Sequence, residues 1–341
     1  MVRIGEITDV SDLSWSRERN SVSSAQVTVI NPTPECCGLL SRVEPWRNEL
    51  VIYRGNERVW DGVVMTPQWS REAVTITARD MLIWTQRAIL KTGYTDNRRS
   101  VVDRSRLILQ SELARFENLN PPINVLPFLQ IYASNVTRQS REILDFEKYV
   151  LDELEDLATA GAHFATVGRS IYIYNRTSDA LGSSATVSEN DFVGDDITIT
   201  AHGMDFGTYA AVTDGEGHAG DAGGTDPYYG LVERLTTQRP EGRDDGDPVD
   251  TEALAEQARL DLAGRNPVPV RLRVGSGATL DPRTALTIDD LVPGRRVPIR
   301  TEMMCRTVTS EQVVDRVQVT ENAGGERIQV TLDRAPFTGG D

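Results

Sequence analysis

The sequence predicts a mainly β protein with an α+β insert, in which two similar β-domains flank a middle α+β domain. The two ends of the chain alternate apolar and polar residues in short stretches separated by turn signals, which is typical of strands. The middle instead carries apolar residues at helical spacing. In addition, residues 49–80 and 295–334 both run strand, turn, strand, break and strand, and they end on the similar stretches VTITARD and IQVTLDR.

These observations divide the chain into four parts. We expect a first β-domain at 1–94, an α+β domain at 95–204, and a connecting segment at 205–266 with acidic glycine-rich loops and a short helix. A second β-domain is expected at 267–341.

The first part opens with expected strands at residues 2–9 and 21–30, the second of which ends at the prolines of NPTP. The stretch VIYRGNERVWDGVV, residues 51–64, predicts a β-hairpin around the two-residue turn Gly55-Asn56. Asp61-Gly62 is expected to break or bulge its second strand, and a third strand is expected at 73–78.

The middle part predicts a helix at 100–117 and a stronger one at 140–160, with Ser140 as N-cap and Gly161 as the stop. A hairpin is expected at 164–174. Residues 213–226 and 239–250 are rich in glycine and acidic residues and are expected to form mobile connections. Between and after them we expect a strand at 229–236 and a helix at 251–263.

The last part predicts closely spaced strands. They are expected at 268–274, 296–299, 304–310, 314–321 and 327–333, with a turn at Pro293-Gly294.

Composition narrows the function classes. The net charge is −15, from 51 acidic and 36 basic residues, and no basic stripe of the kind that grips nucleic acid is visible. No apolar run approaches the roughly 18 residues of a membrane-spanning helix, and no secretory leader is evident. The three cysteines are expected to be reduced, with Cys36-Cys37 in a loop and Cys305 in a strand.

No catalytic motif is found, so we expect no enzyme, no catalytic or cofactor-binding residue and no cofactor. The histidines, His163, His202 and His218, match no metal-ligand spacing and are expected to be structural or solvated. Acidic residues on the helix at 140–160 are expected to form a solvated face, with a glycosidase pair as the weaker alternative; they are Asp152, Glu153, Glu155 and Asp156.

Two acidic stretches, residues 214–216 and 244–247, could attract calcium, but they lack the spacing of a calcium loop, and no metal site is predicted. Tryptophans gather in the first part and could form a sugar-binding platform, although packing in a core or interface is the commoner use; they are Trp15, Trp46, Trp60, Trp69 and Trp84.

The order of parts resembles the baseplate hub or tail-tip minor tail proteins of long-tailed, siphovirus-type phages, most of all those that infect actinobacteria. The segments SWSRERNSVSSAQVTVINPTP and ELVIYRGNERVWDGVVMTPQW carry most of the likeness, followed by YVLDELEDLATAGAHFATVGRSIYIY and the closing RIQVTLDR. The likeness covers most of the chain and is architectural rather than catalytic.

The resemblance implies a virion structural protein made in the host cytoplasm and located at the tail tip. Such hubs are homotrimers in which each chain supplies two tail-tube-like β-barrel domains, so that three chains form a pseudo-sixfold ring that extends the tail tube. The implied partners are the distal tail protein, the tape measure protein, and fibre, spike or other minor tail proteins. Phage DNA would pass through the lumen without specific binding, which an acidic lumen would favour.

Two other functions stay open. The tryptophan-rich first part could belong to a carbohydrate-binding module or glycan hydrolase. Alternatively, the chain could be the hub of a contractile injection system, which would share the fold and the trimer.

Overall fold

The computed structural model describes residues 4–114, 130–134, 138–175, 181–194, 197–215, 217–237, 251–268, 270–275, 278–303 and 305–334. The chain is mainly β. Its helices are α1 (Pro34–Leu40), α2 (Ile83–Arg87), α3 (Val101–Ala114), α4 (Val150–Thr159) and α5 (Thr251–Leu262). No helix in the described ranges is both long and apolar enough to cross a membrane.

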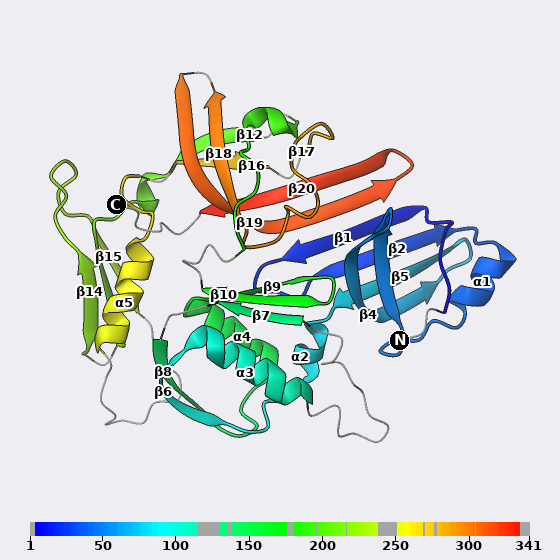
Figure 1. Cartoon of the computed structure of the whole chain (residues 1–341), viewed down its shortest axis with the longest axis horizontal. Helices are drawn as coiled ribbons and strands as arrows, with labels where there is room; N and C mark the ends of the chain where they lie inside the picture. Colours follow the sequence, from blue (N-terminus) through cyan, green and yellow to red (C-terminus); the bar gives the residue numbers. More distant parts are fainter. Residues whose placement is uncertain are drawn as a thin grey trace.

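One large sheet joins the two ends of the chain (Figure 1). Its eight strands run in the order β18-β19-β1-β2-β5-β4-β3, with β20 also paired to β19. They are β1 (Asp12–Glu18), β2 (Ser24–Ile30), β3 (Glu49–Arg54), β4 (Glu57–Trp69), β5 (Ala73–Asp80), β18 (Arg296–Met303), β19 (Arg306–Asn322) and β20 (Gly325–Arg334). As described, these strands form an open path rather than a closed barrel.

The junction between the two ends is the antiparallel pairing of β1 with residues 316–322 of β19. A shared core lies beneath it, in which Trp15 and Trp60 from the first part pack with Val317 and Val330 from the last. The two expected β-domains therefore share one sheet and one core. The domain limits at 94, 204 and 266 stay predictions.

Local turn chemistry explains why the first hairpin is confirmed. β3 and β4 meet at the two-residue turn Gly55-Asn56, where Gly55 has a φ of 60°, and β5 follows as expected. The irregularity in the pairing of β3 and β4 lies at Val59, between the Ile52 and Tyr53 registers, and not at Asp61-Gly62. β2 alternates as expected, with Ala25, Val27 and Val29 buried.

The expected strand at 2–9 is wrong in its described part, because residues 4–11 form no strand and β1 begins at Asp12. Long-range strand pairing explains why the first strand begins at Asp12 and not earlier. β1 is held between β2 and β19, and β19 lies about three hundred positions further along the chain, which no local pattern can show.

In the middle of the chain, helices and strands pack together. A three-stranded sheet packs against α3 and α4, and a two-stranded sheet lies beside them (Figure 1). The strands are β6 (Tyr94–Ser100), β7 (Gln130–Ser134), β8 (Arg138–Ile143), β9 (Ala162–Val167) and β10 (Ser170–Asn175). The hairpin expected at 164–174 is confirmed, and so is a helix in the expected 100–117 region.

The helix expected from Ser140 is wrong over its first ten residues, because α4 begins only after the N-cap Tyr149. Residues 138–143 are instead the strand β8, which pairs with β6. Glu153 also corrects the sequence analysis, since it is buried and lies 3.3 Å from the Lys148 ammonium rather than on a solvated face.

Another part of the chain contains the acidic glycine-rich stretch, which is not the expected mobile loop over its described residues. Ala219–Gly223 forms β14 and pairs with β13 (Tyr209–Thr213), which also pairs with β15 (Glu233–Thr237). Glycine is required at Gly220, because a Cβ there would lie 2.1 Å from the Ala255 nitrogen of α5. The second acidic connection, 239–250, lies outside the described residues.

The last part is more continuous than expected. A single strand, β19, covers both the 304–310 and the 314–321 predictions within its described residues. Two short ladders pair β11 (Phe192–Val193) with β17 (Thr279–Leu280) and β12 (Ile197–Ala201) with β16 (Val270–Val274). Residues of these strands pack on the apolar side of β19 and β20, for example Leu272 and Leu280 in the shared core.

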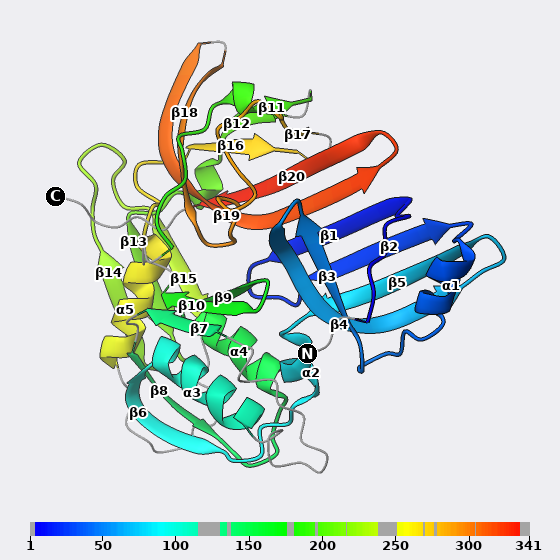
Figure 2. The same ribbon diagram turned by 45° about the vertical axis from the view of Figure 1, so that its right-hand side comes forward.

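The meander β3-β4-β5 has a structural counterpart in the meander β18-β19-β20. In each, the long middle strand bulges where it pairs with the third strand, between Val64 and Thr66 in one and between Val314 and Arg316 in the other. A bulge bends its strand, and in both meanders the first half of the middle strand turns away with its partner, β3 or β18 (Figure 2).

The main chain around the two bulges is also bonded alike. The Val64 amide donates to the Asn48 carbonyl, and its carbonyl accepts from Trp46, which has a φ of 64°. The Val314 amide donates to the Arg295 carbonyl, and its carbonyl accepts from Gly294, which has a φ of 94°. This correspondence aligns VTITARD with IQVTLDR position by position and confirms the repeated pattern seen in the sequence.

Candidate functional site: a polar face on the continuous sheet

The large sheet carries polar residues across one face of the strands β20, β19, β1, β2, β5 and β4. Because side chains alternate between faces, the register places these residues in rows that cross the junction, as in Thr320, Ser14, Gln26, Thr77 and Thr66. We call the set the polar sheet face: Asp12, Ser14, Ser16, Glu18, Ser24, Gln26, Thr28, Thr66, Gln68, Thr75, Thr77, Arg79, Arg316, Gln318, Thr320, Asn322, Arg327, Gln329 and Thr331.

The opposite face of the same strands is apolar and buried. It includes Trp15, Ala25, Val27, Val29, Val74, Ile76, Ala78, Val317, Val319 and Val330. A sheet with one buried and one solvated face produces this alternation, so the polar sheet face is the solvent side of the sheet, although Ser16 within it is buried.

Hydrogen bonds and an ion pair, some within a strand and some between neighbouring strands, hold polar side chains of this face in place. The Ser16 hydroxyl donates to a Glu18 carboxylate oxygen at 3.0 Å, and the Arg316 Nε lies 3.3 Å from the same carboxylate. Thr28 and Thr75 bring their hydroxyl oxygens to 3.3 Å across β2 and β5. Such bonds limit how freely these groups reach out to a passing ligand.

Charge on the polar sheet face is nearly balanced, because its residues include the carboxylates of Asp12 and Glu18 and the guanidinium groups of Arg79, Arg316 and Arg327. The face carries no aromatic side chain on which a base could stack. It offers a hydrated surface of hydroxyl and amide groups that neither attracts nor repels a polyanion strongly.

The tryptophans do not come together as a platform. Trp15 and Trp60 are buried in the shared core, and Trp46 packs edge-on against Trp84 at 5.2 Å between ring centroids. Trp69 is separate and about half exposed, at 52%, at the end of β4. The other four tryptophans therefore take part in packing, which is the commoner of the two uses.

The histidines lie apart in different elements. His163 bonds through Nδ1 to the Asn20 amide at 2.7 Å, and His218 lies 2.8 Å from the buried Asp214 carboxylate. In the described ranges, no three His, Cys, Asp or Glu side chains are grouped closely enough to hold a metal ion. The stretch 244–247 and Glu216 lie outside those ranges.

The cysteines are free thiols, though not where the sequence analysis placed them. Cys36 and Cys37 lie in α1 rather than in a loop, and burial raises the pKa of Cys36. Cys305 lies between β18 and β19 and is exposed.

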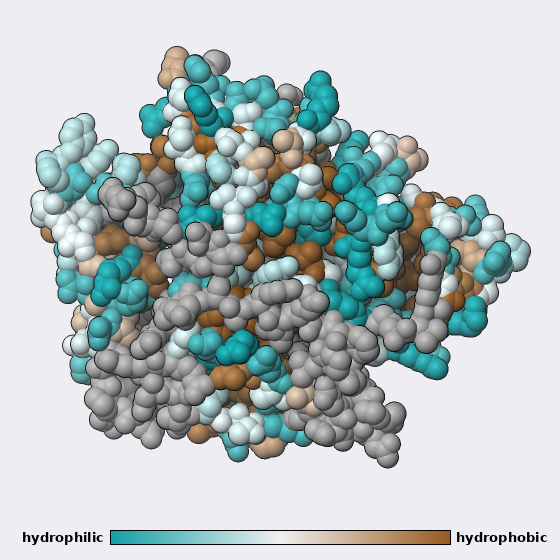
Figure 3. Space-filling model, viewed as in Figure 1, coloured by the Kyte–Doolittle hydropathy of each residue, from teal (hydrophilic) through white to brown (hydrophobic). Residues whose placement is uncertain are grey.

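Hydrophilic residues dominate the side of the molecule drawn in Figure 3, where hydrophobic residues show as separate patches between them. The candidate feature that the sequence did not reveal is the polar sheet face itself. Its signal was present in the polar positions of SAQVTVI and AVTITARD, but the rows form only when β1 joins β19.

No family model and no curated protein sequence matches the chain. Solved structures do. The 43 kDa tail protein of prophage MuSo2 from Shewanella oneidensis aligns with a TM-score of 0.61 at 12% identity, over 96% of this chain and 94% of that one. The tail protein from Neisseria meningitidis MC58 aligns with a TM-score of 0.61 at 11% identity, over 95% and 92%.

The E. coli c3393 protein, a component of the type VI secretion system with structural similarity to T4 bacteriophage tail proteins, aligns with a TM-score of 0.53 at 10% identity, over 97% of this chain and 74% of that one. Along nearly its whole length, this chain has the fold of these tail proteins.

Proposed function

We propose that the chain is a non-enzymatic structural protein of a phage tail tip, a baseplate hub in which three copies form a pseudo-sixfold ring that extends the tail tube. The observation that carries this proposal is the polar sheet face, which runs without a break across two meanders of the same design. A chain that contains two equivalent units can match a six-fold partner with only three copies.

The polar sheet face would line the lumen in such a ring, and the strands that form an open path in one chain would close as a tube-like barrel between chains. DNA would then slide past hydroxyl and amide groups. This arrangement replaces the acidic lumen inferred from composition, because the face carries both signs in near balance and the acidic excess lies elsewhere.

The ring would dock on a distal tail protein on one side and hold fibre, spike or other minor tail proteins on the other, with a tape measure protein inside before ejection. The units built on α3, α4 and α5 would lie at its periphery, where such partners bind. The likeness to a type VI secretion component keeps the hub of a contractile injection system as the second candidate.

Negative-stain class averages and native mass spectrometry of the full chain test the proposal. Three-fold rings with a central channel at three times the chain mass of 37.7 kDa are expected. Antibodies against the chain should label the tail tip of particles from cells that express it. Labelled injection-system particles would favour the second candidate, and particles of either kind without the chain would contradict both.

A further inference from the structure

The edge of β4 beyond its bulge is one of two positions where the described strand neighbours of the two meanders differ. The other is the outer edge of the third strand, where β5 pairs with β2 while β20 pairs with no described strand except β19. In the second meander, the outer edge of β19 after Val314 pairs with β1. In the first, β3 pairs with β4 only as far as Val63, and no described strand pairs with the outer edge of β4 at Thr66–Trp69.

Equivalent side chains show the consequence. The bulges align Pro67 with Val317 and Trp69 with Val319. Both valines are buried, at 0% and 2% exposure, in the shared core, and β1 pairs beside them. Trp69 is 52% exposed, which is unusual for so large an apolar side chain in a strand of a core sheet.

The main-chain groups of this edge support the same conclusion. Ser70 donates to the Ala73 carbonyl in the turn after β4, so the alternation of an antiparallel ladder turns the amide and carbonyl of Trp69 away from β5. Pro67, two positions earlier, has no amide to offer and occupies a site where none is needed for β5. A proline at an edge also discourages unspecific strand addition.

We infer that a strand from a second copy of this chain pairs antiparallel with Pro67–Trp69, taking the place beside β4 that β1 takes beside β19. The occupant is a second copy because the same contact already exists within one chain, between the second unit and the first. Continuing the sheet in this way carries the polar sheet face from one copy to the next. The inference deepens the proposed function, on which it rests, by naming the surface that joins the copies.

Two variants of the full chain test this edge. Trp69→Pro removes the outward amide but keeps the β5 ladder, and Trp69→Lys places a charge on the edge. Either should raise the protein concentration at which half of the chain assembles by roughly tenfold or more. Tyr228→Lys, at another exposed aromatic residue (86%), serves as the matched control and should assemble like the unmodified chain. Circular dichroism and melting temperature check that each variant folds.

Hydrogen exchange gives a second reading that does not depend on a variant. The peptide spanning residues 65–69 should exchange more slowly in assembled than in dilute protein. If both Trp69 variants assemble like the unmodified chain and the peptide gains no protection, the edge inference fails while the ring proposal stands. If the unmodified chain remains monomeric and the peptide is protected only by a different protein, the second copy is the wrong occupant.

Discussion

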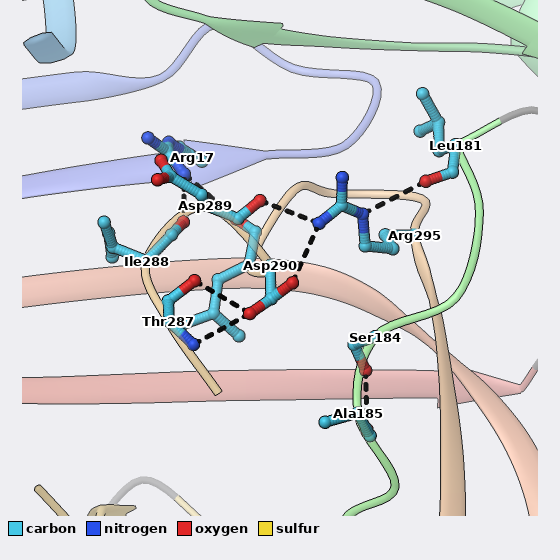
Figure 4. A network of polar contacts seen from close by, with 10 residues as sticks. Arg17, Leu181, Ser184, Ala185, Thr287, Ile288, Asp289, Asp290 and Arg295 are labelled. Atoms are coloured by element: carbon cyan, nitrogen blue, oxygen red, sulfur yellow. Dashed lines mark hydrogen bonds and ion pairs between the residues drawn. The ribbon is translucent and has the colours of Figure 1, made fainter. Parts of the chain in front are cut away.

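Arg17 on β1 donates a hydrogen bond of 2.7 Å from its guanidinium to the carbonyl of Ile288, in the segment between β17 and β18 (Figure 4). The same guanidinium donates to the carbonyls of Leu291 and of Val59 in β4. One buried side chain thus ties together the two β units on the apolar side of the junction. Burial lowers the pKa of Arg17 to about 10, which still leaves it charged at neutral pH.

Replacing Arg17 with methionine is expected to destabilise the chain by roughly 2–4 kcal/mol, because three buried carbonyls lose their donor. Loss of the buried charge offsets part of this cost. Denaturant unfolding measures the change. The exposed Arg327, replaced in the same way, should shift stability by no more than about 0.5 kcal/mol. Equal effects at the two sites would contradict the role given to Arg17.

Nothing in the residues near Arg17 reveals this contact from sequence. Hairpins such as β3-β4 could be predicted because a two-residue turn and alternation act locally, and the likeness of VTITARD to IQVTLDR correctly indicated two related meanders. The pairing of β1 with β19 could not be predicted, since its partners lie at opposite ends of the chain. The polar sheet face depends on that pairing and was missed with it.

Competition between local and distant bonds explains the other differences. Ser140 suits a helix N-cap and Ile143 suits a helical stripe, but the strand that contains both pairs with β6 instead. Gly220 belongs to a stretch whose composition predicts a loop, yet it lets α5 approach β14 closely. Tertiary contacts of this kind override local preference.

The buried Asp80 carboxyl is expected to give the folding stability an unusual pH dependence. Burial raises its pKa to about 6, although the Ser23 and Leu82 amides and the Thr166 hydroxyl donate to it. An acid whose pKa is higher in the folded chain binds its proton more tightly there, so folding is favoured at low pH. Its contribution should therefore fall as the pH rises from about 4 to 6, by on the order of 3 kcal/mol.

Unfolding measured at several pH values from 4 to 7 checks this slope. Asp80→Asn, which does not titrate, should show a smaller loss of stability over that range than the unmodified chain. Asp61, whose pKa burial also raises to about 6, should preserve part of the slope in the variant. An unchanged slope would rule out Asp80 as its source.

Arg169 is expected to stabilise the folded chain most at neutral pH. It lies in the turn between β9 and β10, and its Nε contacts the Asp61 carboxylate of β4 at 2.9 Å, where the Asp61 side chain is fully buried. Arg169→Met leaves that carboxylate with Arg58 alone, at a cost of roughly 3–5 kcal/mol when Asp61 is ionised. At pH 5, where Asp61 is largely protonated, the cost should be clearly smaller. A loss independent of pH would point to packing or to the ion pair of Arg169 with Glu49 rather than to Asp61.

The polar sheet face predicts weak DNA contact that added charge would strengthen. Gln26 and Thr320 lie in one of its rows, and lysines at both positions should give the assembled chain salt-sensitive binding to duplex DNA that the unmodified chain lacks. Each lysine that meets a phosphate should steepen the slope of log affinity against log salt by roughly 0.9. Fluorescence anisotropy, measured between roughly 50 and 200 mM salt, gives this slope.

A variant with lysines at Tyr228 and Leu235, which are exposed outside this face, is the matched control and should bind DNA more weakly. Strong, salt-dependent binding by the unmodified chain would contradict a surface past which DNA slides.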